Sequence, residues 1–254
     1  MKKTATTIAA IAAMLQPVVA QAASFSGRVT LPDGRPAFGA MVTVFDADGE
    51  RRQTVYAAAD GSYAIRTPYA GKLKVRVRLS GFKDGTAEQL VTATGSARLN
   101  LTLGTFANLG EMNETLSASA FNARLPWPNI KRDRPAFVSQ CNYCHQMGNS
   151  WTRIPRDHEQ WIAEVEKMEN MLAMQSRAEG RVIAETLWKG FDGKPFDASQ
   201  NYGASSELSR AKVREWLVGD GYTFIHDADV AKDGLLYGTD EGHDILWVLN
   251  RETG

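Results

Sequence analysis

The feature that most restricts the fold is a series of short alternating segments between residues 24 and 104. Apolar and polar residues alternate with a period of two, as in strands with one buried face, in FSGRVTL, AMVTVFD, RQTVYAA, SYAIRTP, LKVRVRL and ARLNLTL. Turn sequences with Asp-Gly or Ala-Gly separate these segments. We therefore predict an antiparallel β-sandwich over residues 23–104.

The turns of this region resemble those of the carboxypeptidase regulatory-like domain. The best matching parts are PDGRP at residues 32–36 and ADGSY at residues 59–63. The resemblance implies a small sandwich, with relatives among transthyretin-like and starch-binding modules, that serves as an appended spacer or binds carbohydrate. Tyr56, Tyr63 and Tyr69 are scattered and indicate no aromatic platform for a sugar, so carbohydrate stays one open partner of this domain.

The N-terminus has the pattern of a secretory signal peptide. Lys2 and Lys3 precede the apolar run TIAAIAAML, and the small-residue pattern AQA ends at Ala22, so we predict a signal peptide over residues 1–22 and a periplasmic protein. The apolar run is shorter than the roughly 20 residues that cross a bilayer, and we predict no membrane span in the mature chain. The 29 basic and 29 acidic side chains balance, which argues against a nucleic-acid partner.

Both cysteines and one of the four histidines lie together in Cys141-Asn142-Tyr143-Cys144-His145. A disulfide within this motif would close too short a loop to stabilise a fold, and a zinc site would need a fourth ligand. Two thiols on one side of a helical turn can each join a porphyrin vinyl group, with His145 below the iron. The motif therefore favours one covalent haem c, with Cys141 and Cys144 as thioethers and His145 as the proximal ligand, over zinc or a redox disulfide.

The segment after the motif offers a second iron ligand. A capping box of Asp157 and Gln160 predicts the start of a helix. One apolar face of this helix is formed by Trp161, Ile162, Val165, Met168 and Leu172.

The stretch CNYCHQM...HEQWIAEVEKM resembles small c-type cytochrome domains. This resemblance implies Met168 as the distal iron ligand, with Met171, Met174, His158 or an open position as alternatives. Pro155 is a candidate for the carbonyl that accepts a hydrogen bond from the His145 ring, and a simple loop proline is the alternative.

The chain after residue 104 divides into three parts by its sequence pattern. Residues 105–135 read as a linker and residues 136–200 as the haem domain. Residues 201–254 resemble the first blade of a streptogramin lyase-type β-propeller, in which His226 would be structural and His243 a solvated turn residue. Because a propeller needs four or more blades, we expect a truncated chain without lyase activity.

The predicted fold class is multidomain α+β: an antiparallel β-sandwich, then an all-α cytochrome c-like haem domain, then a single incomplete β-propeller blade. The favoured function is electron transfer by a periplasmic cytochrome to or from a redox partner protein or dehydrogenase domain. The alternative is a binding or scaffold module for carbohydrate or another ligand.

Overall fold

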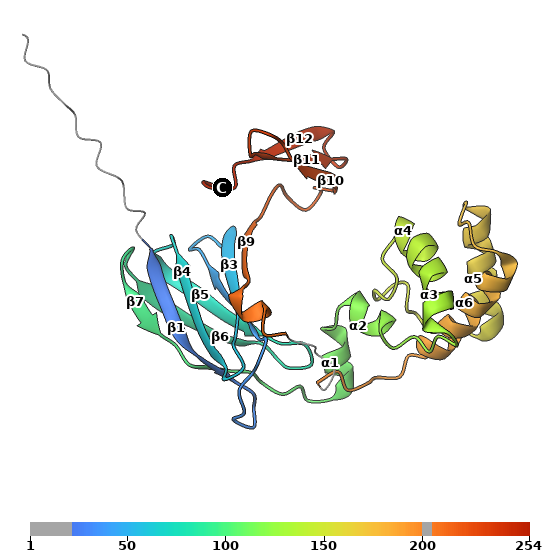
Figure 1. Ribbon diagram of the computed structural model, residues 1–254, viewed down its shortest axis with the longest axis horizontal. Helices are drawn as coiled ribbons and strands as arrows, with labels where there is room; N and C mark the ends of the chain where they lie inside the picture. Colours follow the sequence, from blue (N-terminus) through green and yellow to red (C-terminus); the bar gives the residue numbers. More distant parts are fainter. Residues whose placement is uncertain (1–21, 200–204) are drawn as a thin grey trace, which may run out of the picture.

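The computed structural model describes residues 22–199 and 205–254, which form twelve β-strands and six α-helices (Figure 1). The strands belong to three open sheets of four, five and three strands. Figure 1 shows the β-sandwich at one side, the helices at the other, and a small sheet near the C-terminus. Apart from Ala22, the predicted signal peptide lies outside the described residues.

Two sheets form the sandwich. One has the order β4-β1-β7, with β8 also paired to β1, and the other has the order β6-β5-β2-β3-β9. The bounds are β1 Ala23–Thr30, β2 Met41–Phe45, β3 Arg51–Tyr56, β4 Ser62–Thr67, β5 Gly71–Arg78, β6 Gly85–Val91, β7 Ser96–Arg98, β8 Leu101–Thr102 and β9 Lys212–Trp216.

Alternation along the strands builds the core between these sheets. Leu73, Val75 and Val77 of β5 are completely buried, and so are Val42 and Val44 of β2. The charged residues between them on β5 point to the opposite face, because successive strand side chains alternate in direction. Each buried side chain of this kind contributes roughly 1.5–3 kcal/mol of transfer free energy.

The predicted sandwich over residues 23–104 is confirmed, although its strand pairing differs from the prediction. β1 is antiparallel to β4 but parallel to β7 and β8. The sequence did not indicate β6, because only Val91 at its end is buried and the strand has little apolar alternation. β9, from the region predicted to form a propeller blade, pairs with β3 of the sandwich.

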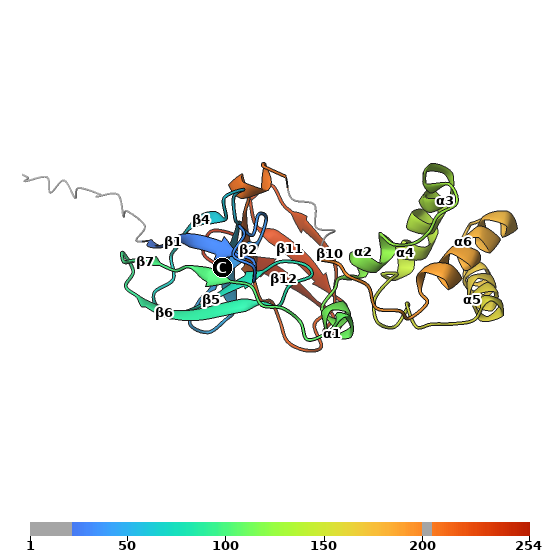
Figure 2. The same ribbon diagram turned by 90° about the horizontal axis from the view of Figure 1, so that it is seen from below.

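A second hydrophobic core lies among the helices. These are α1 Leu109–Glu114, α2 Ala118–Asn122, α3 Ile130–Ala136, α4 Asn142–Cys144, α5 His158–Asn170 and α6 Arg177–Gly190. The side chains of Phe137, Trp161, Ile183 and Leu187 are at most 3% exposed and belong to one cluster. Figures 1 and 2 both place α5 and α6 at the end of the molecule away from the sandwich.

The predicted capping box at the start of α5 is present. The Asp157 carboxylate accepts from the Gln160 backbone N–H at 2.8 Å, and the Gln160 side chain accepts from the Asp157 backbone N–H at 3.0 Å. α6 begins with an equivalent box formed by Ser176 and Glu179. Each box satisfies backbone donors that a helix start otherwise leaves without partners.

The rest of the predicted fold class is contradicted. The described residues form mainly open β-sheets with short helices, and they contain neither an all-α cytochrome c-like domain nor a propeller. Pro135 lies inside α3, and the chain continues through a π-helical turn, Phe137–Cys141, into a helix of three residues. Proline lacks a backbone donor and the π-turn changes the residue spacing, so the two cysteines do not share one regular helix.

The C-terminal sheet has three antiparallel strands and no further blade beside it in the part of the chain that is described. Its strands are β10 Ile225–Val230, β11 Leu236–Asp240 and β12 Ile245–Leu249. His226 is exposed on β10, 3.9 Å from the Glu241 carboxylate. His243 is an exposed turn residue, as predicted, and its Nδ1 lies 2.8 Å from the buried Asp240 carboxylate.

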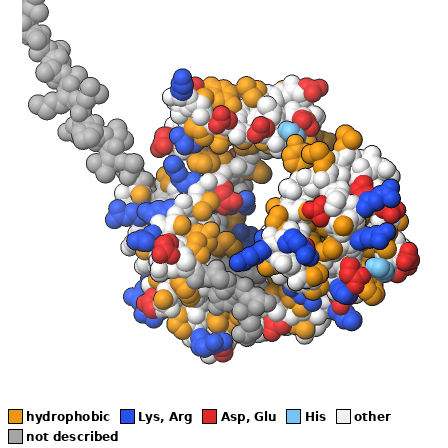
Figure 3. Space-filling view, turned by 45° about the vertical axis from the view of Figure 1, so that its right-hand side comes forward, with side chains coloured by type: hydrophobic (Ala, Val, Ile, Leu, Met, Phe, Trp, Pro, Cys, Tyr) orange, Lys and Arg blue, Asp and Glu red, His pale blue; other side chains and the backbone are white. Residues whose placement is uncertain are grey.

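The surface is hollowed between the parts of the molecule. The space-filling view shows this hollow on one face, with hydrophobic and basic side chains at its margins (Figure 3). No helix among residues 22–199 and 205–254 is long and apolar enough to cross a membrane.

Candidate functional site

The residues predicted to bind haem lie around the π-helical turn. Cys141 is half-buried at the end of this turn, and burial raises the pKa of its thiol to about 11. Cys144 and His145 are exposed, and both cysteines are free thiols. The three side chains therefore differ in their surroundings although they are close in sequence.

The predicted methionine ligands lie at or beyond the end of α5. Met168 is half-buried near the end of α5, whereas Met171 and Met174 beyond the helix are 66% and 83% exposed. No hydrogen bond joins the Pro155 carbonyl to His145. Pro155 lines a pocket in the helical part.

The predicted haem c is contradicted. The described residues contain no group of three or more His, Cys, Asp or Glu side chains that could hold a metal ion. The helices around Cys141 also lack the all-α cytochrome arrangement, for the reasons given above. The cytochrome interpretation and its electron-transfer role, which depended on the haem, are corrected accordingly.

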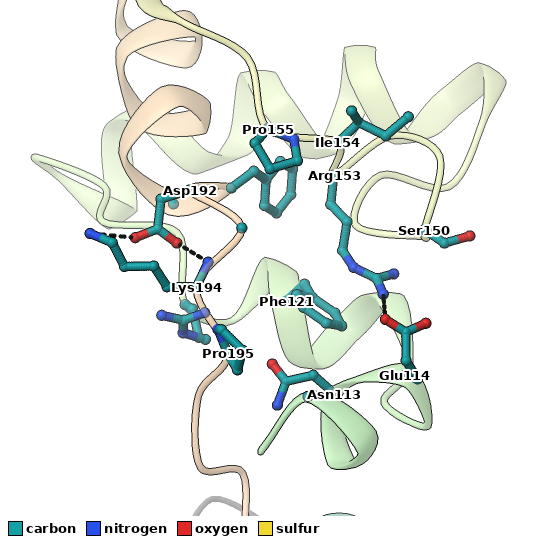
Figure 4. A pocket seen from close by; sticks show the side chains of 15 residues that line it. Asn113, Glu114, Phe121, Ser150, Arg153, Ile154, Pro155, Asp192, Lys194 and Pro195 are labelled. Atoms are coloured by element: carbon teal, nitrogen blue, oxygen red, sulfur yellow. Dashed lines mark hydrogen bonds and ion pairs between the residues drawn. The ribbon is translucent and has the colours of Figure 1, made fainter. Parts of the chain in front are cut away.

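A pocket of about 300 Å³ is the candidate binding site. Three segments that are distant in the sequence line it: residues 110–124 of α1 and α2, residues 150–155 before α5, and residues 190–195 after α6. Figure 4 shows the side chains of these segments arranged around the opening. Ligand pockets are commonly concave, largely apolar and set with a few polar groups, and this one has both kinds of lining.

Two arginines cover two phenylalanine rings at this pocket. The Arg153 guanidinium lies 4.0 Å from the ring centroid of Phe121, and the Arg124 guanidinium lies 3.9 Å from that of Phe196. The two rings meet edge to face with their centroids 5.4 Å apart. The four side chains form one stacked series, which we call the Arg-Phe series, and cation–π attraction stabilises it.

The arginines of the series retain free hydrogen-bonding capacity. Arg153 has a side-chain exposure of only 16%, and its nearest carboxylate oxygen, on Glu114, is 3.9 Å away, beyond hydrogen-bonding distance (Figure 4). Arg124 is exposed and has no carboxylate partner within 4 Å among the described residues. The guanidinium groups therefore present planar donor arrays that the protein itself leaves without acceptors.

Local hydrogen bonds hold the segments that carry the series. The Asn113 side-chain amide donates to the Phe196 carbonyl at 2.7 Å, and its oxygen accepts from the Phe196 N–H at 3.1 Å. In the loop before α5, the Asn149 side chain accepts from two backbone N–H groups at 2.9 Å, those of Trp151 and Thr152. The positions of Phe196 and of the Arg153 loop are thus defined before any ligand binds.

Gly193 shapes the wall of the pocket. Its φ of +75° favours glycine, and a Cβ at this position would lie 2.6 Å from Cγ of Pro155. Nearby, Lys194 and Asp192 pair at 3.5 Å. The pocket rim is therefore polar, whereas Phe121 and the buried Phe191 provide apolar lining.

Sequence reasoning did not find Arg124 or Arg153, which line the pocket, or Phe196, whose ring Arg124 covers. Their segments carry no recognisable spacing, and their association depends on how α1, α2 and the loops pack. Of the predicted residues, Pro155 alone is among those that line this pocket.

Comparison with known families identifies one part of the chain. Residues 24–104 match the carboxypeptidase regulatory-like domain. This match supports the carboxypeptidase regulatory-like sandwich that the sequence predicted. No curated protein matches the chain.

Several solved structures share limited similarity with this protein. A chlorocatechol 1,2-dioxygenase from Pseudomonas putida is 13% identical with a TM-score of 0.28. The matched region covers 33% of this chain and 60% of the dioxygenase chain. A Bacteroides uniformis protein described as carbohydrate-binding is 20% identical with a TM-score of 0.26, covering 32% and 40%. A cohesin–X-dockerin complex from Acetivibrio cellulolyticus is 17% identical with a TM-score of 0.26, covering 35% and 63%. The chain spans less than two thirds of each.

Proposed function

We propose that this protein is an exported, periplasmic binding and scaffold module. The sandwich holds the helical part, and the pocket between α1, α2 and the loops beside α5 and α6 binds a small ligand with a carboxylate. A sugar acid is the ligand class that combines the chemistry of the pocket with a carbohydrate partner.

The observation that carries this proposal is the Arg153 guanidinium, whose ion pair with the exposed Glu114 carboxylate is 3.9 Å long. It is largely buried and stacked on Phe121, yet no carboxylate lies within hydrogen-bonding distance. A carboxylate ligand can accept two parallel N–H bonds from such a fork, and charge-assisted bonds of this kind are stronger than neutral ones. An incoming carboxylate would therefore satisfy donors that are otherwise left to water.

The lining also suits a sugar ring. The pocket volume of about 300 Å³ lies at the small end of the range for ligand sites. Pro155, Pro195 and Phe121 offer apolar surface, while Ser150 and Asp192 supply polar groups for hydroxyls. A ring with hydroxyls and one carboxylate matches this mixture.

The connection between the two parts supports the scaffold role. The chain leaves the sandwich after β8 and returns to it at β9, where five residue pairs join Lys212–Trp216 to β3. The helical part is thus attached to the sandwich at both ends. This arrangement limits how far the pocket can move relative to the sandwich.

The test is isothermal titration calorimetry of the full chain with D-galacturonate and D-glucuronate, with D-galactose and D-glucose as neutral comparisons. We expect saturable binding of at least one acid and at least tenfold weaker binding of its neutral counterpart. Arg153→Gln should weaken acid binding by tenfold or more. Arg134→Gln is the matched control, because it removes the same charge from an exposed position on α3 outside the pocket.

Two results would overturn the proposal. Absence of saturable binding to either acid would reject sugar acids as ligands. Equal loss of binding in Arg153→Gln and Arg134→Gln would show that the pocket arginine does not recognise the carboxylate. Circular dichroism of both variants verifies that each has folded.

A further inference from the structure

The outward face of the five-stranded sheet carries a row of cations. On β5 the buried residues alternate with Lys72, Lys74, Arg76 and Arg78, so these four side chains share the side of the sheet away from the core. Alternate residues of a strand are about 6.6–6.8 Å apart, so the charges recur at nearly regular distances. We call this surface the basic face and define it by Phe45, Arg52, Lys72, Lys74, Arg76 and Arg78.

Three of these cations surround one aromatic ring. The charged groups of Arg76, Lys74 and Arg52 lie 5.2, 5.6 and 6.0 Å from the Phe45 ring centroid. Phe45 is half-buried at the end of β2, and its register partner on β3 is Arg52. Cation–π attraction offsets part of the repulsion among the three charges but does not neutralise them.

Three carboxylates lie near the basic face, and Glu88 is also the register partner of Lys74. Glu88 pairs with Lys72 at 2.6 Å, Asp84 with Arg78 at 2.7 Å, and Glu215 with Arg52 at 3.1 Å. Lys74 and Arg76 form the centre of the face.

The two central cations lack close acceptors. Lys74 is exposed and has no carboxylate within 4 Å among the described residues. The nearest carboxylate to Arg76, that of Asp84, is 3.8 Å away, and the buried Nε of Arg76 has no hydrogen-bond partner. Lys74 is exposed and the Arg76 side chain is 24% exposed, so an anion on this face can pair with charges that have no close carboxylate.

We propose that the basic face docks an acidic polysaccharide, with carboxylates of the polymer at Lys74 and Arg76 and a sugar ring against Phe45. An extended polymer fits a row of charges along one strand better than a compact ligand does. A nucleic acid favours broad basic surfaces, whereas this chain has 29 basic and 29 acidic side chains in balance. This surface is on the sandwich and does not depend on the pocket of the helical part.

Affinity electrophoresis of the full chain in gels that contain polygalacturonate tests the proposal, with dextran gels as the neutral comparison. We expect retardation by polygalacturonate that weakens as NaCl is raised, because salt screens exposed charges, and none by dextran. The double substitution Lys74→Gln/Arg76→Gln should weaken retardation at least tenfold. Arg134→Gln/Lys232→Gln removes the same charge from α3 and the turn after β10 and should leave it unchanged.

Several outcomes would overturn the proposal. These are no retardation of the wild-type chain, or equal losses in both double variants. Stronger retention by single-stranded DNA would instead assign a nucleic acid, and stronger retention by vesicles with phosphatidylglycerol would assign a lipid surface. Arg153→Gln should retain binding to polygalacturonate, which separates this surface from the pocket. If the double variant fails to fold, Lys74→Gln alone provides the test, since Lys74 is exposed.

Discussion

Alkylation kinetics should distinguish the two cysteines, because their surroundings differ. Burial raises the pKa of the Cys141 thiol to about 11, whereas Cys144 is exposed at the end of α4. The two proteins to compare are Cys144→Ser, which retains Cys141, and Cys141→Ser, which retains Cys144. Serine is similar in size to cysteine, so each variant keeps one thiol with little change in packing.

The expected rate follows from the ionised fraction, because the thiolate is the reactive form. At pH 8 a thiol with a pKa of about 11 is roughly 0.1% ionised, whereas an ordinary thiol with a pKa near 8.5 is about 24% ionised. The ionised fraction of the ordinary thiol is therefore about 240 times larger than that of Cys141. A more basic thiolate is also a better nucleophile, which offsets roughly 10–18-fold of this difference. The Cys141 thiol should therefore react about 13–24 times more slowly than an ordinary thiol, before any further reduction from restricted access.

Iodoacetamide modification followed by intact mass spectrometry measures both rates. Between pH 8 and pH 10 the Cys141 rate should rise about tenfold per pH unit, since the thiolate fraction rises by that factor below the pKa. Equal rates for the two single-cysteine proteins would refute the assigned burial. Failure of either cysteine to react in the denatured wild-type protein would refute its assignment as a free thiol.

Three further predictions concern stability and titration. Ser176→Ala should lower the free energy of unfolding by about 1 kcal/mol through loss of the α6 cap; urea denaturation that shows no change would contradict the capping role. Leu73→Ala should lower the free energy of unfolding by about 2–5 kcal/mol, because the side chain is completely buried. Leu90→Ala, at a 74% exposed site, should change it little. Similar losses for both variants would contradict the core assignment. A hydrogen bond to Asp240 raises the pKa of His243 above the ordinary value of about 6.5. The stability that the charged His243 ring contributes is therefore complete below about pH 6.5 and is lost as the pH rises through the folded pKa. Proton NMR titration of the imidazole tests this, and Asp240→Asn should lower the His243 pKa.

Local patterns predicted several elements correctly. The alternation in LKVRVRL predicts a strand with one buried face, and β5 buries Leu73, Val75 and Val77 as this pattern requires. Asp157 and Gln160 predict a capping box, and both hydrogen bonds are formed. These features depend on residues a few positions apart, so the sequence contains the information needed to predict them.

Other features depend on contacts between distant residues. β9 resembles part of a propeller blade in sequence, but its backbone pairs with β3, more than 150 residues earlier in the chain. His243 lies in a turn of polar residues, yet its ring faces the buried Asp240 carboxylate. The prediction of a haem was wrong for a related reason. A motif specifies which residues are adjacent in sequence, but not the helix geometry or the ligands that surround it.

By itself, the sequence determined the carboxypeptidase regulatory-like sandwich, the buried face of each main strand, and the start of α5. Tertiary structure alone decided that Arg124 and Arg153 stack on adjacent rings in one pocket, and that Lys74 and Arg76 remain without close acceptors on the basic face. The physical reason is the range of the interactions. Periodicity and capping operate within a strand or a helical turn, whereas a pocket and a charged surface depend on side chains brought together by folding.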